Sequence, residues 1–365
     1  MRARPERLDR LPEQYFTALL AGVGAAAAAG GEPLIDLGRG NPETGPPSHV
    51  AEALARGAAR PDVHGYAPFN GLPELKEAIA ARYGDRYGVE LDPEREVAVL
   101  PGTKTGLIEF ALCAVERGET ILLPDPGYPD YLSAVALAGA RHARFAGFET
   151  AAAALYLNFP SNPTAAVAPE GIFGEAVAWA QRTGAWILHD FAYGDLVFDG
   201  RQPMSFLAVD GAREVGVELF SMSKSYGMAG WRLGFALGNT ELVKRIQLLQ
   251  EHAFAGIFLP MQEAGIAALT GPQESVENRR AAYERRRDQA LRALGGLDAR
   301  SQGTFFVWFR LPVGLTAAGL LKEHRLAVAP GEGFGPNGAG WARLSLAVPD
   351  ETLELGLQRL RAAIR

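Results

Sequence analysis

Short apolar segments alternate with helical stretches through the middle of the chain, and this order constrains the possible folds more than any other feature of the sequence. The apolar segments have the length of β-strands, and most of the stretches between them are helical in character. Such an order predicts an α/β fold in which helices flank a mostly parallel sheet. We expect strands at residues 97–100, 120–123, 154–158, 185–189, 217–221 and 233–237, and helices at 107–116, 131–138 and 171–183.

The two ends of the chain predict further parts around this large domain. A long arginine-rich helix is expected at 274–294, and the sequence after it predicts a smaller α/β C-terminal domain. Its expected elements are strands at 304–310 and 343–347 and a helix at 351–364, while another helix is expected at 16–29. We therefore divide the chain into an N-terminal segment that packs with the small domain and the mouth of the site, a large ligand-binding domain and a small domain. Their ranges are 1–41, 42–285 and 286–365.

Composition argues against several classes of protein. Apolar residues make up 48% of the chain, so a packed core is expected. The net charge is −6, and a helix would spread the one dense basic run, Arg285-Arg286-Arg287, around its surface, so we expect no nucleic-acid binding. The single cysteine, Cys113, fits a reducing compartment, and the N-terminal region holds no apolar stretch of signal-peptide or transmembrane length. We expect a cytoplasmic protein without membrane contact.

Polar segments rich in glycine or proline follow five of the predicted strands or lie beside their ends. In an open α/β sheet, ligands bind beyond the carboxyl ends of the strands. A single site at that edge is therefore the simplest explanation for all five. The segments are Pro101–Lys104, Pro124–Tyr128, Pro160–Thr164, Asp190–Tyr193 and Ser221–Arg232.

The segment after the strand at 217–221 carries the most specific chemistry. Lys224 stands close to two hydroxyl residues, Ser221 and Ser223, and eight positions before Arg232. An amine, clustered hydroxyls and a fixed cation suit a cofactor that carries both an aldehyde and a phosphate, of which pyridoxal 5′-phosphate is the common one. Lys224 could form a Schiff base with the aldehyde, while the other three residues hold the phosphate. The alternative for the short Ser-Lys-Ser string is a solvated turn.

Three further segments offer partners for such a cofactor. Asp190 ends an apolar strand, where a carboxylate needs a partner, and a protonated pyridine nitrogen would supply one. Tyr193 and Asn162 could donate to the phenolate oxygen of the cofactor, and Tyr128 could stack on its ring. The alternatives are a helix cap or internal ion pair for Asp190, a turn for Asn162, and core packing for both tyrosines.

Two other positions point to anions. The Gly102-Thr103-Lys104 turn opens a predicted helix, where backbone N–H groups could hold a phosphate. The alternative is an ordinary turn between a strand and a helix. Arg343 lies on a predicted strand and suits an amino-acid carboxylate, unless it is an exposed strand arginine. No metal site is expected, because the sequence holds neither H-E-x-x-H nor a Cys/His cluster; His189 reads as a structural or supporting histidine.

Taken together, the segments resemble the class I/II aminotransferases, which are fold-type I pyridoxal-phosphate enzymes, over nearly the whole chain. The resemblance includes Asp36–Pro42, Tyr66–Leu75 and the five segments above in the order of the family. It departs from the family at Ala165, where the motif Asn-Pro-Thr-Gly has its glycine. A turn that needs a positive φ would be mildly strained there. The stretch from Phe148 to Leu155 is also short compared with many relatives.

The resemblance implies a role for each matching residue. Lys224 would be the Schiff-base lysine and proton carrier, Asp190 the partner of the pyridinium, and Tyr128 the stacking aromatic. Tyr193 and Asn162 would bind the phenolate oxygen. It further implies phosphate ligands at Thr103, Lys104, Ser221 and Arg232, a carboxylate site at Gly40 and Arg343, and Tyr66 reaching the phosphate of a neighbouring subunit. A homodimer with shared sites, acting on an amino acid and a 2-oxo acid by a ping-pong mechanism, is implied as well.

Within the family, the resemblance is strongest to a subgroup of three activities. The strings at 11–16, 60–66, 125–131 and 189–194 resemble methionine-salvage transaminases, which act on 4-methylthio-2-oxobutanoate with an amino donor such as glutamine, and also alanine and LL-diaminopimelate aminotransferases. The side-chain pocket is expected to involve Tyr15, Phe16, Arg39 and Phe258. An aromatic pocket suits a thioether or another neutral substrate, whereas Arg39 could instead pair with a second carboxylate.

Activities of other classes remain alternatives. A β-lyase that cleaves C–S bonds could use the same scaffold and cofactor. A nicotinamide oxidoreductase would need a G-x-G-x-x-G turn after its first strand, which is missing. A cofactor-binding regulatory module would need an added DNA-binding domain, for which the chain has neither the length nor a basic patch.

Overall fold

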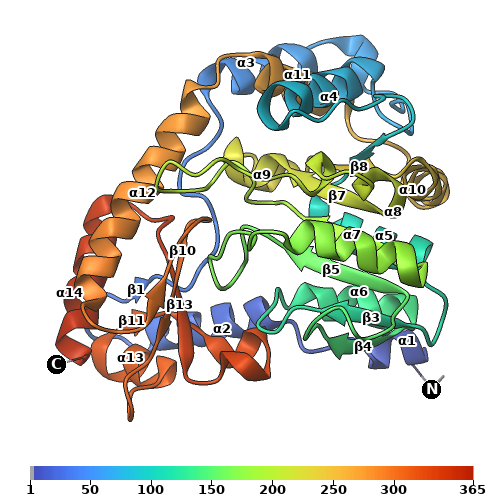
Figure 1. The fold of residues 1–365 in the computed structure, drawn as a ribbon. Helices are drawn as coiled ribbons and strands as arrows, with labels where there is room; N and C mark the ends of the chain where they lie inside the picture. The colour runs from blue at the N-terminus through green and yellow to red at the C-terminus, as the bar shows by residue number, and fades with distance from the viewer. Residues whose placement is uncertain (1–3, 365) are drawn as a thin grey trace.

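A seven-stranded sheet forms the centre of the molecule, for which the computed structural model describes residues 4–364 (Figure 1). The strand order is β2-β8-β7-β6-β5-β3-β4. Four of the pairings, from β7 to β4, are parallel, and only β8 runs against its neighbours. The strands are β2 (Val97–Leu100), β3 (Thr120–Leu123), β4 (Arg141–Arg144), β5 (Ala154–Asn158), β6 (Trp186–Asp190), β7 (Gly216–Ser221) and β8 (Gly234–Gly238). The predicted α/β fold with a mostly parallel sheet is confirmed.

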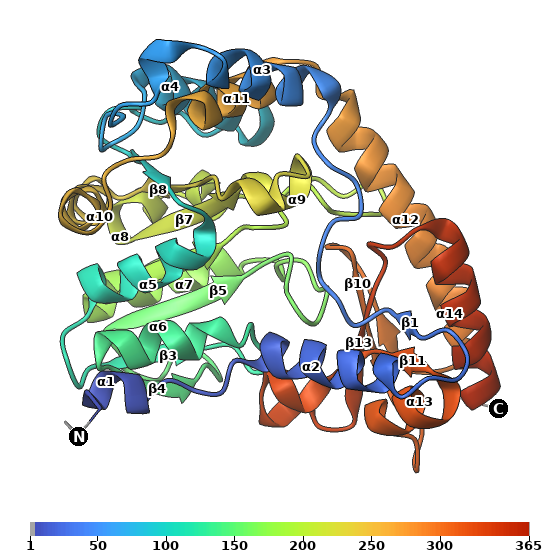
Figure 2. The same cartoon turned by 180° about the vertical axis from the view of Figure 1, so that it is seen from behind.

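Side chains alternate along the strands and so divide the interior into two cores. On β5, Ala154 and Tyr156 face one core, while Leu155 and Leu157 face the other. The first core is covered by α5 (Thr103–Ala114), α6 (Asp130–Ala138) and α10 (Thr240–Ala253). The second is covered by α4 (Pro73–Tyr87), α7 (Ile172–Thr183), α8 (Ala212–Val215), α11 (Leu259–Thr270) and α3 (Ser48–Ala58). Figures 1 and 2 show α7 and α5 on opposite sides of the sheet.

A second, smaller sheet lies beside the large one. Its order is β12-β13-β10-β9, and all of its pairings are antiparallel. The strands are β9 (Ala299–Arg300), β10 (Phe306–Arg310), β12 (Ala329–Pro330) and β13 (Trp341–Ser345), and α12 (Glu274–Leu294), α13 (Ala317–His324) and α14 (Asp350–Ala363) accompany them. The N-terminal part joins this region, because β1 (Ile35–Asp36) pairs in parallel with β11 (Leu326–Ala327). The chain begins with α1 (Glu6–Asp9) and α2 (Tyr15–Ala28).

The division at 41/42 and 285/286 stays a prediction, and its outermost residues, 1–3 and 365, lie outside the described part. The later boundary falls inside α12, which runs from the large sheet to the small one (Figure 1). One expectation about α12 is wrong: only Arg285 of the arginine run lies at the surface. Arg286 and Arg287 are buried in ion pairs, because they lie on the inward side of the helix.

Ala165 adopts the backbone conformation that its place in the motif predicts. Its φ is +54°, and its side chain is fully buried. The carbonyl of Ala165 accepts hydrogen bonds from the backbone of Gln302 and Gly303, which lie just before β10. The strained turn therefore ties the loop after β5 to the small domain. Within residues 4–364, no helix is long and apolar enough to cross a membrane.

Candidate active site

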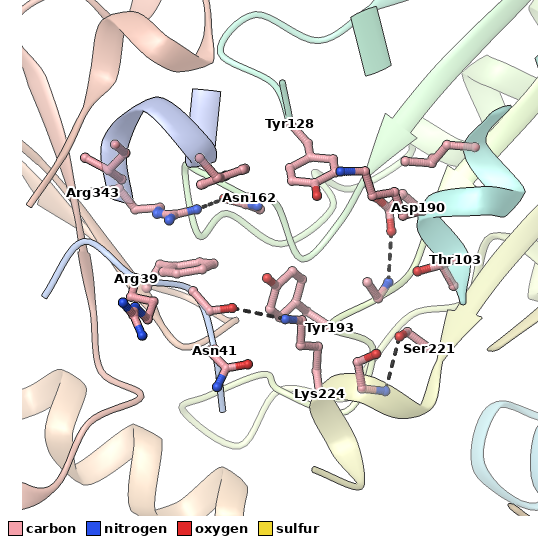
Figure 3. Close-up of a pocket in the computed structure, with 18 of the residues that line it drawn as sticks. Arg39, Asn41, Thr103, Tyr128, Asn162, Asp190, Tyr193, Ser221, Lys224 and Arg343 are labelled. Carbon is pink, nitrogen blue, oxygen red and sulfur yellow. Dashed lines mark hydrogen bonds between the residues drawn. The ribbon is translucent and has the colours of Figure 1, made fainter. Parts of the chain in front are cut away.

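A cavity of about 480 Å³ opens where the large sheet meets the small domain (Figure 3). It collects most of the residues that the sequence singled out, although they come from eight separate segments. The predicted residues that line it are Phe16, Arg39, Gly40, Thr103, Lys104, Tyr128, Asn162, Asp190, Tyr193, Ser221, Ser223, Lys224, Arg232 and Arg343.

Strand direction explains why these segments meet. The strands β3, β5, β6 and β7 are parallel, so the loops that carry Tyr128, Asn162, Tyr193 and Lys224 leave the sheet at the same edge. Arg232 reaches that edge from the opposite direction, because it precedes the antiparallel strand β8. The edge is the place where open α/β sheets bind ligands.

Lys224 lies on α9 (Met222–Ser225), a single helical turn directly after β7. Ser221 caps this turn, since its hydroxyl oxygen accepts the N–H of Ser223 at 3.2 Å. The Lys224 amine donates to the carbonyl of Gly40 at 3.3 Å. Burial, together with the nearby cations Arg343 and Arg232, lowers the pKa of Lys224 to about 8. The neutral form of this amine is therefore much more populated near neutral pH than that of an ordinary lysine, which makes Lys224 more nucleophilic.

Asp190 presents its carboxylate at the end of β6. One oxygen accepts the hydroxyl of Tyr131 at 2.9 Å, and the other accepts the N–H of Ala192 at 3.2 Å. Burial raises the pKa of Asp190, and these two hydrogen bonds act against that shift. Asn158, on the adjacent strand, holds the backbone of both Asp190 and Asn162. A positively charged N–H group in the cavity would give the carboxylate the partner that a buried charge needs.

The start of α5 forms an anion-binding corner. Gly102 precedes the helix with φ +90°, and a Cβ at this position would overlap the Arg232 guanidinium. Arg232 can therefore lie against the bare backbone beside the first N–H groups of the helix. The ammonium of Lys104 points elsewhere and pairs with Asp130 at 3.0 Å, so Lys104 offers this corner its backbone.

Arg343 is a buried cation without an anionic partner among the described residues. It donates to Asn162 Oδ1 at 2.6 Å and to the carbonyl of Gly38 at 3.0 Å, while its Nε has no partner in the described part of the chain. Its guanidinium lies 3.9 Å from the centre of the Phe306 ring. Burial lowers the pKa of Arg343 to about 10. A guanidinium held in this way is ready for a carboxylate from outside the chain.

Three predicted residues lie away from this cavity. The Tyr15 hydroxyl donates to the carbonyl of Pro330 at 2.8 Å, and the next residue, Phe16, lines the cavity instead. Tyr66 is 89% exposed, and Phe258 stacks on His64 at the surface. Sequence reasoning also missed Tyr131 and its bond to Asp190, although Tyr131 stands only three positions after Tyr128.

The residues of the cavity suit the aldehyde, the ring nitrogen and the phosphate of pyridoxal 5′-phosphate. A depressed-pKa amine can meet the aldehyde, a carboxylate can meet the ring nitrogen, and the glycine corner with Arg232 can meet the phosphate. Among the described residues, no cluster of acidic, histidine or cysteine side chains could hold a metal ion. The fold and the site together define a fold-type I pyridoxal-phosphate enzyme.

Comparison with known proteins identifies the family of this enzyme. The family described as aminotransferase class I and II matches residues 32–360, and the chain belongs to this family. It is 41% identical to an L-glutamine–4-(methylsulfanyl)-2-oxobutanoate aminotransferase of Bacillus subtilis, over 97% of this chain and 94% of that protein. It is 38% identical to the glutamate-pyruvate aminotransferase AlaC of Escherichia coli, over 99% and 95%.

A solved structure agrees with the sequence matches. Substrate-bound BacF of Bacillus subtilis superposes with a TM-score of 0.93 and 36% identity, and the alignment covers 100% of this chain and 98% of that one. The chain is therefore a pyridoxal-phosphate-dependent aminotransferase, as its sequence predicts.

Proposed function

We propose that this aminotransferase accepts 2-oxo acids with a neutral, partly apolar side chain, with 4-(methylsulfanyl)-2-oxobutanoate as acceptor and glutamine as donor. The main support for the proposal is that the two arginines in the cavity differ in burial and in ion pairing. Arg343 is buried and has no anionic partner within residues 4–364, whereas Arg39 is 61% exposed and already pairs with Asp36 at 3.5 Å. One carboxylate is thus expected per substrate. Phe16, Leu19 and Leu20 of α2 give the cavity an apolar wall that suits a thioether.

The chain's own residues divide the work as follows. Bound pyridoxal 5′-phosphate supplies an aldehyde that joins amines and a ring that accepts electrons. Lys224, as the free amine, would take the proton from the substrate α-carbon and deliver it to the carbon that carried the cofactor's aldehyde, so that the amino group stays with the cofactor when the 2-oxo acid leaves. Asp190 keeps the ring nitrogen protonated by accepting its hydrogen bond, and Tyr193 and Asn162 donate to the phenolate oxygen.

Residues at the two ends of the cavity bind and orient the cofactor and the substrate. The N–H groups of Thr103 and Lys104, with Ser221, Ser223 and Arg232, hold the phosphate. Arg343 holds the substrate carboxylate beside the Gly40 backbone, where a Cβ would meet the Phe306 ring at 3.0 Å. Tyr128 lines the cavity and would pack on the face of the cofactor's ring.

A second candidate substrate class follows from Arg39 alone. If Arg39 releases Asp36, it can bind the distal charge of a longer dicarboxylic substrate. LL-Diaminopimelate aminotransferase from Desulforudis audaxviator is 38% identical to this chain, and the alanine enzyme is equally similar, so both activities belong in the test. A β-lyase would instead release ammonia and a 2-oxo acid from a sulfur amino acid without an acceptor.

The test is a panel of donor and acceptor pairs on the purified enzyme and on Arg39→Gln. Glutamine with 4-(methylsulfanyl)-2-oxobutanoate is expected to give the highest kcat/KM, and Arg39→Gln is expected to keep it within about threefold, since less than about 0.7 kcal/mol of binding is at stake. Highest turnover with alanine or LL-diaminopimelate, or a large loss in Arg39→Gln with the methylsulfanyl acceptor, would overturn the assignment.

We also propose a cytoplasmic homodimer with shared sites. The aromatic side chains of Tyr66, Phe69 and Phe258 are exposed, and exposed apolar side chains are often buried in an interface. Tyr66 would reach the phosphate end of the partner's site from there. Light scattering is expected to give twice the 39.0 kDa chain mass, and a stable monomer with full activity would contradict the proposal.

A further inference from the structure

A buried pair of ionisable side chains lies under the active-site edge of the sheet. His189 on β6 faces Glu218 on β7 in register, and both side chains are 0% exposed. His189 Nδ1 lies 2.7 Å from Glu218 Oε2, and Nε2 lies 3.0 Å from the carbonyl oxygen of Phe159. Neither residue lines the cavity.

Three hydrogen-bond donors besides His189 are directed at the carboxylate of Glu218. It accepts hydrogen bonds from the Tyr83 hydroxyl at 2.7 Å, the Ser205 hydroxyl at 2.8 Å and the Phe206 N–H at 2.7 Å. The Ser205 oxygen already accepts the N–H of Leu207, so its own hydrogen is free for Glu218. Several donors directed at one carboxylate stabilise the negative charge.

The protonation of His189 follows from its two partners. A carbonyl oxygen can only accept, so Nε2 carries a hydrogen. If the carboxylate of Glu218 is ionised, Nδ1 carries a hydrogen as well, and the ring is an imidazolium. Phe173 and Phe191 pack on it with ring centres at 4.8 and 5.2 Å. The charge therefore lies in an apolar, water-poor layer, where its electrostatic effect reaches further than in solvent.

His189 directly precedes Asp190 on β6, so its charge can act on the Asp190 carboxylate. The two residues are consecutive on β6, so they project to opposite faces of the sheet, Asp190 toward the cavity and His189 toward the α7 core. We propose that His189 is a positioning residue that acts through Asp190: its fixed positive charge keeps the Asp190 carboxylate ionised and able to bind a protonated ring nitrogen. This inference rests on the role proposed above for Asp190.

The buried carboxylate of Asp190 needs a nearby positive charge to stay ionised. Burial raises the pKa of Asp190, and the Lys224 amine faces it only while no cofactor engages that amine. Tyr131 and the Ala192 N–H provide neutral hydrogen bonds. The positive charge of His189 also lowers the pKa of Asp190 and is independent of what the cavity contains; the Glu218 carboxylate offsets part of this effect.

The main experiment compares two ligands on apoprotein, by quenching of intrinsic fluorescence. One is pyridoxal 5′-phosphate, and the other is its 1-deaza analogue, which lacks the ring nitrogen. His189→Gln is expected to raise the dissociation constant of the natural cofactor about tenfold and that of the analogue less than about twofold. Added to Asp190→Asn, it should cause no further loss. Equal weakening for both ligands, or full additivity, would mean a purely structural role and overturn the inference.

Two further results keep the inference separable from its premise. If Asp190→Asn discriminates the ligands but His189→Gln binds both as the unmodified protein does, only the inference about His189 fails. If Asp190→Asn itself binds both normally, the role proposed for Asp190 fails, and the inference with it. Nitrogen-15 NMR of histidine-labelled apoprotein, with His189 assigned by sequential backbone correlations in the unmodified protein, should give an imidazolium at pH 8. A neutral ring there would overturn the inference even if the variant folds poorly.

Discussion

The ε-amine of Lys224 lies where its charged form is disfavoured. Burial and two nearby arginines hold its pKa at about 8 in the folded chain, whereas an unfolded lysine titrates near 10.5. The unfolded state therefore binds more protons between these two values, so stability rises with pH across that window. The cost of the buried charge is complete below about pH 8 and disappears above about 10.5.

This cost predicts an effect on the apoprotein. Lys224→Met should raise the free energy of unfolding at pH 7 by up to about 3 kcal/mol, because it replaces a partly desolvated charge with an apolar chain of similar length. The gain should shrink as the pH approaches 10. Urea denaturation at both pH values measures it, with Lys244→Met on the exposed side of α10 as control, expected within about 0.5 kcal/mol. A gain that does not change with pH would contradict the assigned environment.

Some of the site residues could be predicted from the sequence, and others could not. The lysine, the aspartate and Arg343 could be found because charged groups next to apolar strands need a purpose. Tyr15 and Phe16 are neighbours on one helix, and only the rotation of α2 decides that Phe16 faces the cavity. Tyr131 supports Asp190 across 59 positions of sequence, a contact that no local pattern reports.

At the scale of elements, the junction of β2 and α5 carries the anion site. The helix begins directly after Gly102, whose φ of +90° turns the chain at the sheet edge, and Arg232 lies against its bare Cα. Any side chain here strains the backbone and displaces the arginine as well. The same position thus serves both the fold and the proposed phosphate contact.

A matched pair of glycines separates these two effects. Gly102→Ala and Gly118→Ala both place a side chain at positive φ, +90° and +85°, but only the first meets another group. Each should lose roughly 1–2 kcal/mol of stability. Only Gly102→Ala should also weaken pyridoxal 5′-phosphate binding, by at least about tenfold, since it disturbs a charge-assisted contact. Calorimetric titration of apoprotein measures this, and equal affinities for the two variants would exclude the proposed corner.

Most elements could be predicted because apolar strands and amphipathic helices have their own periods. β2, β3 and β5 begin and end as predicted, and so does α12. β4 was missed because its sequence, Arg-His-Ala-Arg, is polar and mostly exposed at the edge of the sheet. The two-residue strands β1 and β11 depend on pairing between distant segments, which leaves no local signal.

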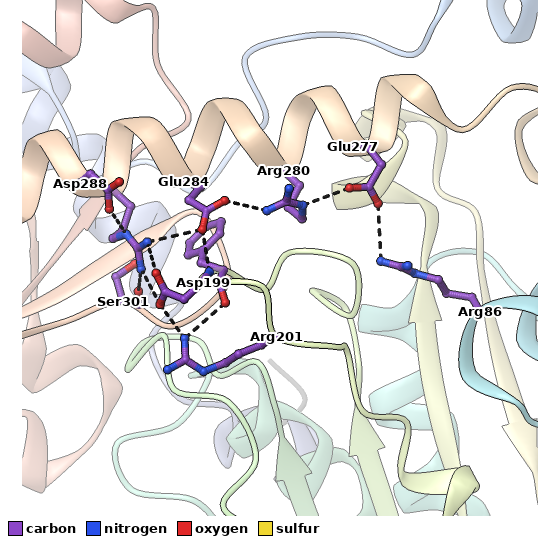
Figure 4. A network of polar contacts seen from close by, with 10 residues as sticks. Arg86, Asp199, Arg201, Glu277, Arg280, Glu284, Asp288 and Ser301 are labelled. Atoms are coloured by element: carbon purple, nitrogen blue, oxygen red, sulfur yellow. Dashed lines mark hydrogen bonds and ion pairs between the residues drawn. The ribbon is translucent and has the colours of Figure 1, made fainter.

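At the scale of the whole molecule, α12 connects the two sheets through a network of ion pairs (Figure 4). Arg287 lies at its centre with 6% of its side chain exposed. It pairs with Asp199, from the loops after β6, at 2.6 Å and donates to the carbonyl of Ser301, next to β9, at 3.0 Å. One side chain thus joins both domains to the helix between them.

Removing this side chain should loosen the whole assembly. Arg287→Met is expected to lower the free energy of unfolding by about 1–3 kcal/mol, because it leaves the buried carbonyl of Ser301 without this donor and removes the ion pair with Asp199, which keeps its pair with Arg201. Arg285→Met is the control on the same helix, since Arg285 is 67% exposed and its pair with Asp350 is 3.9 Å long. It should change stability by less than about 0.5 kcal/mol. Thermal and urea unfolding compare the two, and equal losses would refute the role of Arg287.

The central claim is that the amine of Lys224 binds the cofactor covalently. The most direct measurement is borohydride reduction of the purified, cofactor-loaded enzyme, followed by mass spectrometry of its peptides. The account predicts one pyridoxyl group per chain, on the peptide that contains Lys224, and none in Lys224→Met. A pyridoxyl group on another lysine, or an unmodified Lys224 in a fully loaded enzyme, would contradict it.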